Sequence, residues 1–429
     1  MPHASAQIQP DPDARAADGA GVRTKRVVIL GSTGSIGTQT VDAIEHLNAL
    51  HSAGRFPHRY QVVGLGAGSN GTLLLDQAER LGVTACALAS DPGGHATRAN
   101  SSDRSIHIGS DAAERLVRAA HAGSGCDLVL GAVVGAAGLA SVLVALELGI
   151  DVALANKETL VAAGSLVVPL ARSTGARILP VDSEHAGVWQ CLMQAMGPDY
   201  APPEPIDRDI ARIVLTASGG AFRDREPDDV ADASPEQALA HPTWDMGAKV
   251  TIDTATLVNK ALELIEAHWL FGVDADRLDA VIHPTSTVHA FVEMGDGSVV
   301  AQLGAPDMRT PILRALAHPL RSPEPIAPMD LAALGNLEFR PIEGAWRRAI
   351  DLGMWVIRAG GDAGAVFNAS NEEGVRAFLE RRIPFGRILE TVAAVCESHT
   401  VGPITSLGDV IDADARARGR ARTLIGDAS

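Results

Sequence analysis

Residues 27–37 have the sequence VVILGSTGSIG, the order of a buried strand, a tight turn and the start of a helix. Four apolar residues run directly into glycine, which is typical of a strand buried on both faces. The turn has the spacing G-x-x-G-x-x-G, and apolar periodicity after it predicts a helix over 38–50. Backbone N–H groups at such a helix start can hold a pyrophosphate, because glycine lets the phosphate come close. The stretch therefore predicts the opening of a dinucleotide-binding domain.

Strands and helices continue to alternate after this turn. Apolar runs at 60–65, 84–89, 127–134, 151–155 and 177–181 predict further strands, with helical periodicity between most of them. This alternation predicts an α/β fold whose N-terminal part is a parallel, doubly wound Rossmann-type sheet.

The rhythm changes after about residue 182. A helix over 186–196, a strand over 210–216 and one long helix over 255–271 predict a central α+β domain, and three helices within 344–424 predict a C-terminal helical bundle. The expected division is a tail at 1–24, an NADPH-binding domain at 25–181, a catalytic and dimerisation domain at 182–318, a proline-rich linker at 319–343 and a helical domain at 344–429.

Composition restricts the class of partner. The 429 residues carry 36 Lys+Arg against 52 Asp+Glu, a net charge of −16, and only 3 % aromatic residues. An acidic chain with few aromatics is not suited to binding nucleic acid. Four scattered cysteines and the lack of an apolar run of roughly 18 residues favour a reduced, cytoplasmic protein outside the membrane. The N-terminal 24 residues have no apolar core, so we do not expect a signal peptide.

The end of the second strand bears on the choice of dinucleotide. Gly68, Ser69 and Asn70 stand where an NAD-specific domain normally places an acid for the ribose hydroxyls. No acid is present, which favours NADP, although no Lys or Arg stands there either.

A pair of acids follows the strand at 177–181. Asp182 and Glu184, two residues apart, could converge on one hard divalent cation. The alternative is structural: Asp182 or Ser183 would cap the following helix, with Glu184 in its first turn. These residues alone leave both readings open.

The helix predicted over 255–271 favours the metal site. It is apolar around most of its circumference, yet Asn259, Glu263 and Glu266 share one face, with Lys260 beside them. Lys260 and Glu263 could instead form an ordinary surface pair. A third carboxylate joining Asp182 and Glu184 would make a site suited to Mg²⁺ or Mn²⁺.

Three further polar loops follow predicted strands or are bounded by Gly and Pro. They are Asn156-Lys157-Glu158, Ser218-Gly219-Gly220, which is small enough to bind a phosphate, and the segment 241–247, which is suited to a lid. Each also has a plain alternative, such as Lys157 as a solvated charge or Trp244 as core.

Taken together, these motifs resemble the 1-deoxy-D-xylulose 5-phosphate reductoisomerase family. The resemblance runs in order from about Val27 to the C-terminal helices. It is carried by GSTGSIG (31–37), LANKE (154–158), PVDSEH (180–185), ASGGAFR (217–223), HPTWDMG (241–247), NKALELIEAHWLF (259–271), IHP (282–284), DGSVVAQLGAPDMRTPI (296–312) and NASNE (368–372).

The resemblance implies a homodimeric enzyme of the non-mevalonate isoprenoid pathway. It implies rearrangement and reduction of 1-deoxy-D-xylulose 5-phosphate to 2-C-methyl-D-erythritol 4-phosphate with NADPH and Mg²⁺ or Mn²⁺, Co²⁺ being a further candidate. The metal ligands it implies are Asp182, Glu184 and Glu263, with Lys157 and His241 as further catalytic residues. Substrate contacts would come from Ser183, Ser218, His241, Thr254, Asn259, Lys260 and Glu263, with Trp244 and Met246 closing over the substrate. Cofactor contacts would come from Thr33, Gly34, Ser35, Ile36, Gly68, Ser69, Asn70, Asn156, Glu158 and Gly247.

The chain departs from the family pattern in four places. Thr254 replaces a common serine, Ala261 a common glycine, and Ser69 a residue that is basic in some members. Asp245 adds an acid to the expected lid, and we expect it to point outward. The competing functions are a Rossmann-fold NADP-dependent dehydrogenase of another small phosphorylated or acidic substrate, and a nucleotide sensor without catalysis. Neither has a use for three converging carboxylates.

Overall fold

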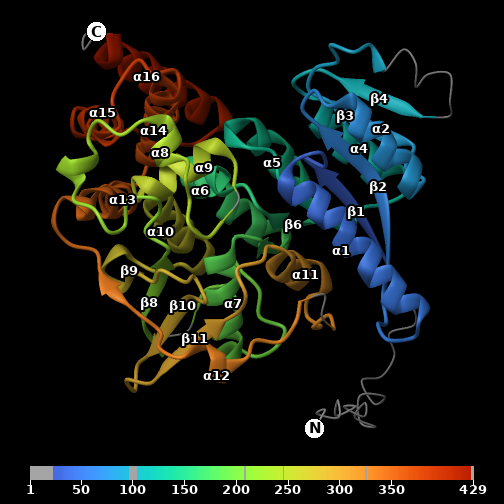
Figure 1. The fold of residues 1–429 in the computed structure, drawn as a ribbon. Helices are drawn as coiled ribbons and strands as arrows, with labels where there is room; N and C mark the ends of the chain where they lie inside the picture. Colours follow the sequence, from blue (N-terminus) through green and yellow to red (C-terminus); the bar gives the residue numbers. More distant parts are fainter. Residues whose placement is uncertain (1–22, 96–103, 207–208, 245, 324–325, 427–429) are drawn as a thin grey trace.

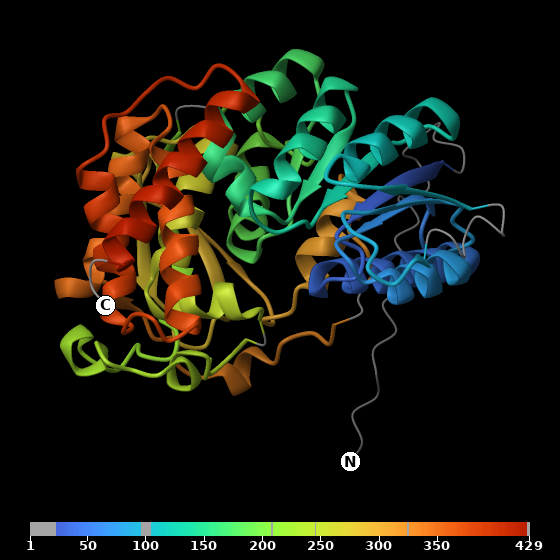
Figure 2. The same ribbon diagram turned by 90° about the horizontal axis from the view of Figure 1, so that it is seen from above.

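The computed structural model describes residues 23–95, 104–206, 209–244, 246–323 and 326–426. Figure 1 shows two sheets side by side, the N-terminal one in blue and teal, with the C-terminal helices at the far end of the molecule. In the turned view of Figure 2, the green and teal helices from the middle of the chain lie between the blue N-terminal part and the red C-terminal helices. Within these ranges no helix is both long and apolar enough to cross a membrane.

The N-terminal sheet is parallel throughout, as predicted. Its seven strands have the order β4-β3-β2-β1-β5-β6-β7. They are β1 (Thr24–Leu30), β2 (Arg59–Ala67), β3 (Ala85–Leu88), β4 (Ser105–Ile108), β5 (Leu128–Gly131), β6 (Asp151–Leu154) and β7 (Ile178–Pro180). The order reverses between β1 and β5, and ligands of open α/β sheets bind at the carboxyl ends beside such a point.

Helices cover both faces of this sheet. They are α1 (Ser35–Ser52), α2 (Gly71–Leu81), α4 (Ala112–Gly123), α5 (Leu139–Glu147), α6 (Lys157–Thr174) and, from later in the chain, α11 (Arg309–Ala317). The sequence analysis missed β4, α4 and α11. Residues 96–103 of the loop expected at 91–105 lie outside the described residues, whereas Ser105 already belongs to β4.

The second sheet is mixed and has the order β11-β10-β8-β9-β12. Its strands are β8 (Ile210–Ala217), β9 (Leu278–Ile282), β10 (Val288–Met294), β11 (Val299–Leu303) and β12 (Arg340–Pro341). Helices α7 (Ser183–Met196) and α10 (Val258–Phe271) pack on this sheet. Because β12 pairs with β9, the end of the proline-rich stretch at 319–343 is part of the sheet; this stretch also contains the short α12 (Leu331–Leu334).

The helix expected over 255–271 begins later than expected, at Val258, and the separate helix before it was missed. The structure has α9 (Ala248–Ala255) and then α10, with a break at Thr256 and Leu257. Leu257 adopts a left-handed conformation with φ of 60°, which ends the hydrogen-bonded ladder of α9 and lets α10 begin at Val258. Apolar periodicity runs through both helices, so it could not reveal the break.

The C-terminal helices are α13 (Arg347–Ala359), α14 (Ala363–Leu379), α15 (Gly386–Glu397) and α16 (Leu407–Gly426). The first three were expected, and α16 was not resolved as a helix of its own. Helix α14 packs against both α6 and α9, so this bundle reaches the middle of the molecule.

Candidate active site

Asp182 stands between β7 and α7, at the N-cap position of the helix. Its side chain makes no capping hydrogen bond. Instead, Asp182 Oδ2 lies 2.6 Å from Lys157 Nζ, at the start of α6. The capping alternative is therefore wrong for Asp182. Its carboxylate is turned toward Lys157, which follows the neighbouring strand β6.

Glu263 comes from the buried face of α10, and its side chain is 2 % exposed. Its Oε1 accepts a hydrogen bond from Lys157 Nζ at 2.8 Å, and the Asn259 amide donates to the same oxygen. Asn259 also accepts from Lys157 at 3.0 Å. The polar stripe of α10 thus faces the loop of α6, not solvent.

The carboxylates of Asp182, Glu184 and Glu263 converge. One oxygen of each lies within 4.8 Å of the others. Lys260 Nζ lies 2.7 Å from Glu184 Oε1 and also pairs with Glu263, so two ammonium groups bridge three carboxylates. Lys157 is 12 % exposed and Lys260 3 %, so the reading of Lys157 as a solvated charge is wrong.

Burial and charge shift the ionisation of this cluster. Burial alone would lower the pKa of Lys157, but Asp182 and Glu263 raise it well above its ordinary value. Burial and the neighbouring Glu263 raise the pKa of Glu184, against the opposing effect of Lys260. Lys157 is therefore held as an ammonium, and the Glu184 carboxylate accepts a proton more readily than that of Asp182, whose pKa, despite burial, is lowered by Lys157 and His185.

His185 contacts the carboxylate cluster from the buried side of α7, a role that the sequence analysis did not predict. Its ring is fully buried, and Nε2 donates to the backbone oxygen of Glu263 at 2.8 Å. Nδ1 lies 3.3 Å from Asp182 Oδ1 and 3.4 Å from Glu266 Oε2. Burial lowers the pKa of His185, but Glu266 and Asp182 outweigh it and raise it to about 9. The sequence did contain a signal for this role. His185 directly follows the ligand candidate Glu184 on α7, and Glu266 lies three residues after the ligand candidate Glu263 on α10.

The lid candidate is tied to the serine-glycine loop by His241. Nδ1 of His241 accepts from the backbone N–H groups of Thr243 at 3.1 Å and Trp244 at 2.8 Å, so the proton of the neutral ring is on Nε2. Nε2 lies 3.0 Å from Ser218 Oγ. Trp244 is half-buried, so it is not core, and Asp245 lies outside the described residues.

Thr254 lies against the same serine-glycine loop. A Cβ on Gly220, whose φ is 68°, would approach the Thr254 backbone oxygen to 2.8 Å. The Thr254 hydroxyl donates to the oxygen of Val250 at 2.8 Å, inside α9. Gly220, two residues after Ser218, thereby packs against Thr254, whereas Asn259 and Lys260 point toward the carboxylates.

The glycine-rich turn joins β1 to α1 at the switch point of the sheet. Gly31 has φ of 83°, and a Cβ there would overlap the backbone of Ala132, at the end of β5. A Cβ on Gly37 would overlap the Gly31–Ser32 backbone, whereas a Cβ on Gly34 would meet only the Gly31 oxygen, at 3.3 Å. The first and third glycines therefore allow the turn to pack, and the middle one leaves room above the start of α1. Thr33 lies in the same turn, and Ser35 and Ile36 are the first residues of α1.

Loops from other strands surround this turn. Gly31 donates to the oxygen of Gly66 in β2, which continues into Gly68, Ser69 and Asn70. The Asn156 amide donates to Val133 and Gly135, which fixes the loop after β5. The carboxylate of Glu158 does not stand free, because Lys249 Nζ lies 2.7 Å from it.

Lys249 belongs to a buried ionic group that was not expected from the sequence. Besides Glu158 it lies 2.9 Å from Asp253, which accepts from the Asn371 amide at 2.8 Å. The group joins α6, α9 and α14. It sits directly after Gly247, at the end of the lid segment.

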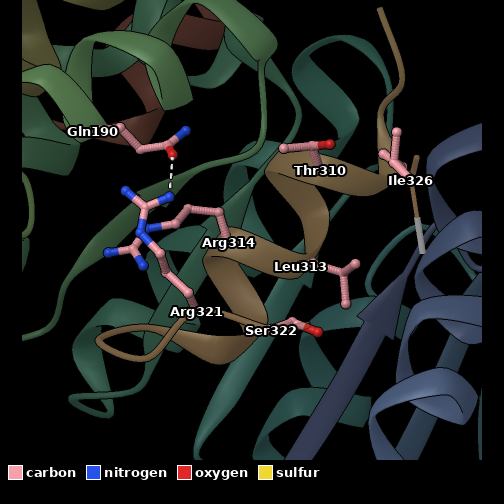
Figure 3. A pocket seen from close by; sticks show the side chains of 7 residues that line it. All are labelled: Gln190, Thr310, Leu313, Arg314, Arg321, Ser322 and Ile326. Carbon is pink, nitrogen blue, oxygen red and sulfur yellow. Dashed lines mark hydrogen bonds between the residues drawn. The ribbon is translucent and has the colours of Figure 1, made fainter. Parts of the chain in front are cut away.

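Two cavities lie beside α7 on the side of α11. The larger, about 190 Å³, is lined by Gln190, Thr310, Leu313, Arg314, Arg321, Ser322 and Ile326 (Figure 3). The smaller shares Gln190 and Thr310 with it and reaches Ser183 and His289. Neither is lined by the three carboxylates, so chemistry and not cavity size identifies the site.

Family models match most of the chain. Residues 27–164 match 1-deoxy-D-xylulose 5-phosphate reductoisomerase, 178–271 match the C-terminal domain of that enzyme, and 303–420 match a second DXP reductoisomerase C-terminal domain. A reductoisomerase of Anaeromyxobacter dehalogenans is 43 % identical over 402 residues, covering 94 % of this chain and 97 % of the relative. That of Gloeobacter violaceus is 43 % identical over 405 residues, with the same coverage. The chain belongs to the 1-deoxy-D-xylulose 5-phosphate reductoisomerase family.

Solved reductoisomerases have the same fold. The enzyme of Zymomonas mobilis in complex with NADPH has a TM-score of 0.82 and 37 % identity, covering 94 % of this chain and 99 % of that one. A DOX-P reductoisomerase in complex with NADPH, fosmidomycin and magnesium has a TM-score of 0.82 and 34 % identity, covering 94 % and 98 %.

The residues of this chain fit a hard divalent cation and a dinucleotide. The converging donors are carboxylate oxygens, which suit Mg²⁺ and Mn²⁺. The turn at Gly34 is free of side chains in front of a helix start with no acid in its first turn.

Proposed function

We infer that this chain catalyses the NADPH- and divalent-metal-dependent conversion of 1-deoxy-D-xylulose 5-phosphate to 2-C-methyl-D-erythritol 4-phosphate. The convergence of Asp182, Glu184 and Glu263 beside the loop of Lys157 carries this conclusion. It is supported by family membership and by the solved relatives in complex with NADPH and magnesium.

The three carboxylates would hold the cation, and the loops around residues 31–37 and 68–70 would hold NADPH. When bound, the cation supplies a Lewis acid for the substrate's ketone and NADPH supplies the hydride. Ser183, whose hydroxyl donates to Glu184, orients that carboxylate.

Lys157 acts as a charge and a hydrogen-bond donor, not as a base. Its pKa is held well above the ordinary value by Asp182 and Glu263, so it carries no free lone pair near neutral pH. An ammonium 2.6–2.8 Å from these carboxylates is placed to donate to a substrate oxygen that becomes negative in the same site.

The lid and the serine-glycine loop would bind the phosphate end of the substrate. The loop of Ser218 packs against Thr254 through Gly220, and His241 bridges Ser218 to the lid backbone. Burial and Arg223 lower the pKa of His241, so it is neutral and donates through Nε2. Phosphate binding at Ser218 would thereby fix the lid segment with Trp244 and Met246, which excludes water from the reacting carbons.

The test is an absorbance assay of NADPH oxidation with purified protein and 1-deoxy-D-xylulose 5-phosphate, with Mg²⁺ or Mn²⁺ and then with a chelator. NADPH loss that stops on chelation and returns with metal supports the function. NADPH loss indifferent to the chelator would indicate the plain dehydrogenase, and no loss with either metal would contradict the reductoisomerase activity.

We also propose that the chain is a homodimer that pairs through the outer face of the mixed sheet. Val299, Leu303 and Phe339 are 55 %, 36 % and 41 % exposed there, and Phe339 packs edge-on against Phe291 of β10. An exposed apolar face of this kind marks an interaction site. Light scattering should give twice the chain mass, and Val299→Glu should lower it; a wild-type monomer would contradict the proposal.

A cytoplasmic location is part of the same proposal. All four cysteines are buried free thiols, as expected in a reducing compartment.

A further inference from the structure

The end of β2 has no basic residue with which to bind a negatively charged 2′-phosphate. The adenosine ribose of a dinucleotide lies at this strand end in Rossmann-type domains, and the 2′-phosphate of NADPH adds about two negative charges there. The residues from Gly68 to Thr72 are Gly, Ser, Asn, Gly and Thr, so they contain no Lys or Arg. Selectivity for NADPH over NADH therefore needs a cation from another segment.

His95, in the segment after β3, lies against the start of α2. Its Nε2 is 3.2 Å from the Thr72 hydroxyl, and its Nδ1 is 2.8 Å from Asp91 Oδ1. Asp91 also accepts from the His95 backbone N–H at 2.9 Å, so one carboxylate oxygen orients both the ring and its backbone. The side chain is 15 % exposed, which leaves it in reach of a ligand at the helix start.

Two glycines make room for this ring. A Cβ on Gly71 would lie 2.5 Å from His95 Nδ1, and one on Gly93 would overlap the ring. Neither glycine has a left-handed backbone there, so the space taken by His95, and not conformation, is the local reason for glycine. His95 is thus seated in a fixed place and is not a loose surface side chain.

We propose that His95 is the residue with which this chain recognises the 2′-phosphate of NADPH, together with Ser69, Asn70 and Thr72. The carboxylate of Asp91 only accepts, so Nδ1–H points to Asp91 and Nε2 faces the helix start. An imidazolium donates from both nitrogens, and it can keep Asp91 while it donates Nε2–H to a phosphate oxygen. The hydroxyls of Ser69 and Thr72 and the first turn of α2 add neutral donors.

The inference deepens the proposed function, since it rests on NADPH as cofactor, but its test needs neither substrate nor metal. Calorimetric titrations of the full chain with NADPH and NADH, and with 2′,5′-ADP and 5′-AMP, measure the contribution of the 2′-phosphate directly. His95→Phe keeps a ring on Gly71 and Gly93 and removes both nitrogens. His121→Phe, at the exposed C-terminal end of α4, is the matched control.

The expected result is selective. His95→Phe should weaken NADPH and 2′,5′-ADP binding by roughly tenfold or more, the loss of one hydrogen bond to a charged group, and leave NADH and 5′-AMP unchanged. His121→Phe should change none of the four affinities. Adding Ser69→Arg to His95→Phe should restore the preference for NADPH.

Two results would overturn the proposal: equal weakening of all four ligands, which would mean that His95 only packs, or no weakening of any. If His95→Phe does not fold, Thr72→Val probes the same contact from the helix side, and an unchanged NADPH to NADH ratio in it would also count against the proposal. A wild-type chain that binds NADPH and NADH equally refutes this inference alone, whereas one that binds neither refutes the proposed function as well.

Discussion

The carboxylate cluster in the middle of the chain and the glycine-rich turn near its start are built from opposite kinds of residue. Around Glu263, charged side chains are buried and hold one another through Lys157 and Lys260. Around Gly34, the structure consists of backbone packed so closely that Gly31 and Gly37 cannot carry a Cβ. Ion pairs between buried side chains hold the first region together, whereas close packing of the backbone holds the second. Substitutions in the two regions should therefore impair the protein in different ways.

The largest effect is expected in the charged region. Glu263→Gln keeps the shape of the side chain but removes the charge that Lys157 and Lys260 share. We expect a folded protein whose metal-dependent kcat/KM falls by roughly a hundredfold or more, since loss of residues that only support metal ligands already costs about 10–100-fold. Metal titration followed by the NADPH assay measures it. Glu45→Gln, in an exposed pair on α1, is the control, and full activity of Glu263→Gln would remove this residue from the site.

The group around Lys249 lies between the two regions and tests whether charge also supports the cofactor side. Lys249→Met leaves Glu158 and Asp253 buried without their cation, so unfolding free energy should fall by roughly 3–5 kcal/mol. Lys249→Arg should lose less. Arg80→Met, which breaks an exposed pair with Glu45, should cost no more than about 1 kcal/mol in the same urea titration. A loss as small for Lys249→Met would show that the buried group is not needed.

The two regions also differ in how far the sequence could predict them. The glycine turn was predictable because strand, turn and helix are adjacent in sequence. The convergence of Asp182 and Glu263 was predictable because a polar stripe on an apolar helix requires a polar neighbour.

The rest depends on distant segments. Nothing in the pattern around Lys249 indicates Asn371, more than a hundred residues away, and nothing around Thr72 indicates His95. The break at Leu257 is a single left-handed residue in an apolar run, which periodicity does not register. Contacts between distant segments determine these features, whereas the local sequence pattern determines the glycine turn and the polar stripe of α10.

In the glycine-rich turn, two substitutions should affect stability and NADPH binding separately. Gly37→Ala forces a Cβ into the Gly31 backbone, so we expect a loss of roughly 1–3 kcal/mol of unfolding free energy. Gly34→Ala brings a Cβ only to 3.3 Å from the Gly31 oxygen, so a small shift accommodates it and we expect a smaller loss, of about 1 kcal/mol or less, yet it should weaken NADPH binding because the methyl stands where the pyrophosphate approaches. Urea unfolding and NADPH titration of the two variants measure the split. Equal losses of stability would contradict the different roles assigned to the two glycines.

The smallest effect concerns a buried histidine outside both regions. His185, among carboxylates, has a raised pKa, whereas burial and the nearby Arg177 and Arg314 lower the pKa of His318 to about 3. The unfolded chain binds a proton there near pH 6.5, so between pH 6.5 and 3 the unfolded state holds more protons and stability falls as the pH falls. His318→Phe, which keeps a ring against Trp189, should remove up to about 1.4 kcal/mol per pH unit from that slope. Urea midpoints from pH 7 to 4 measure the slope, with His121→Phe as the control. An unchanged slope would show that His318 takes up its proton without unfolding.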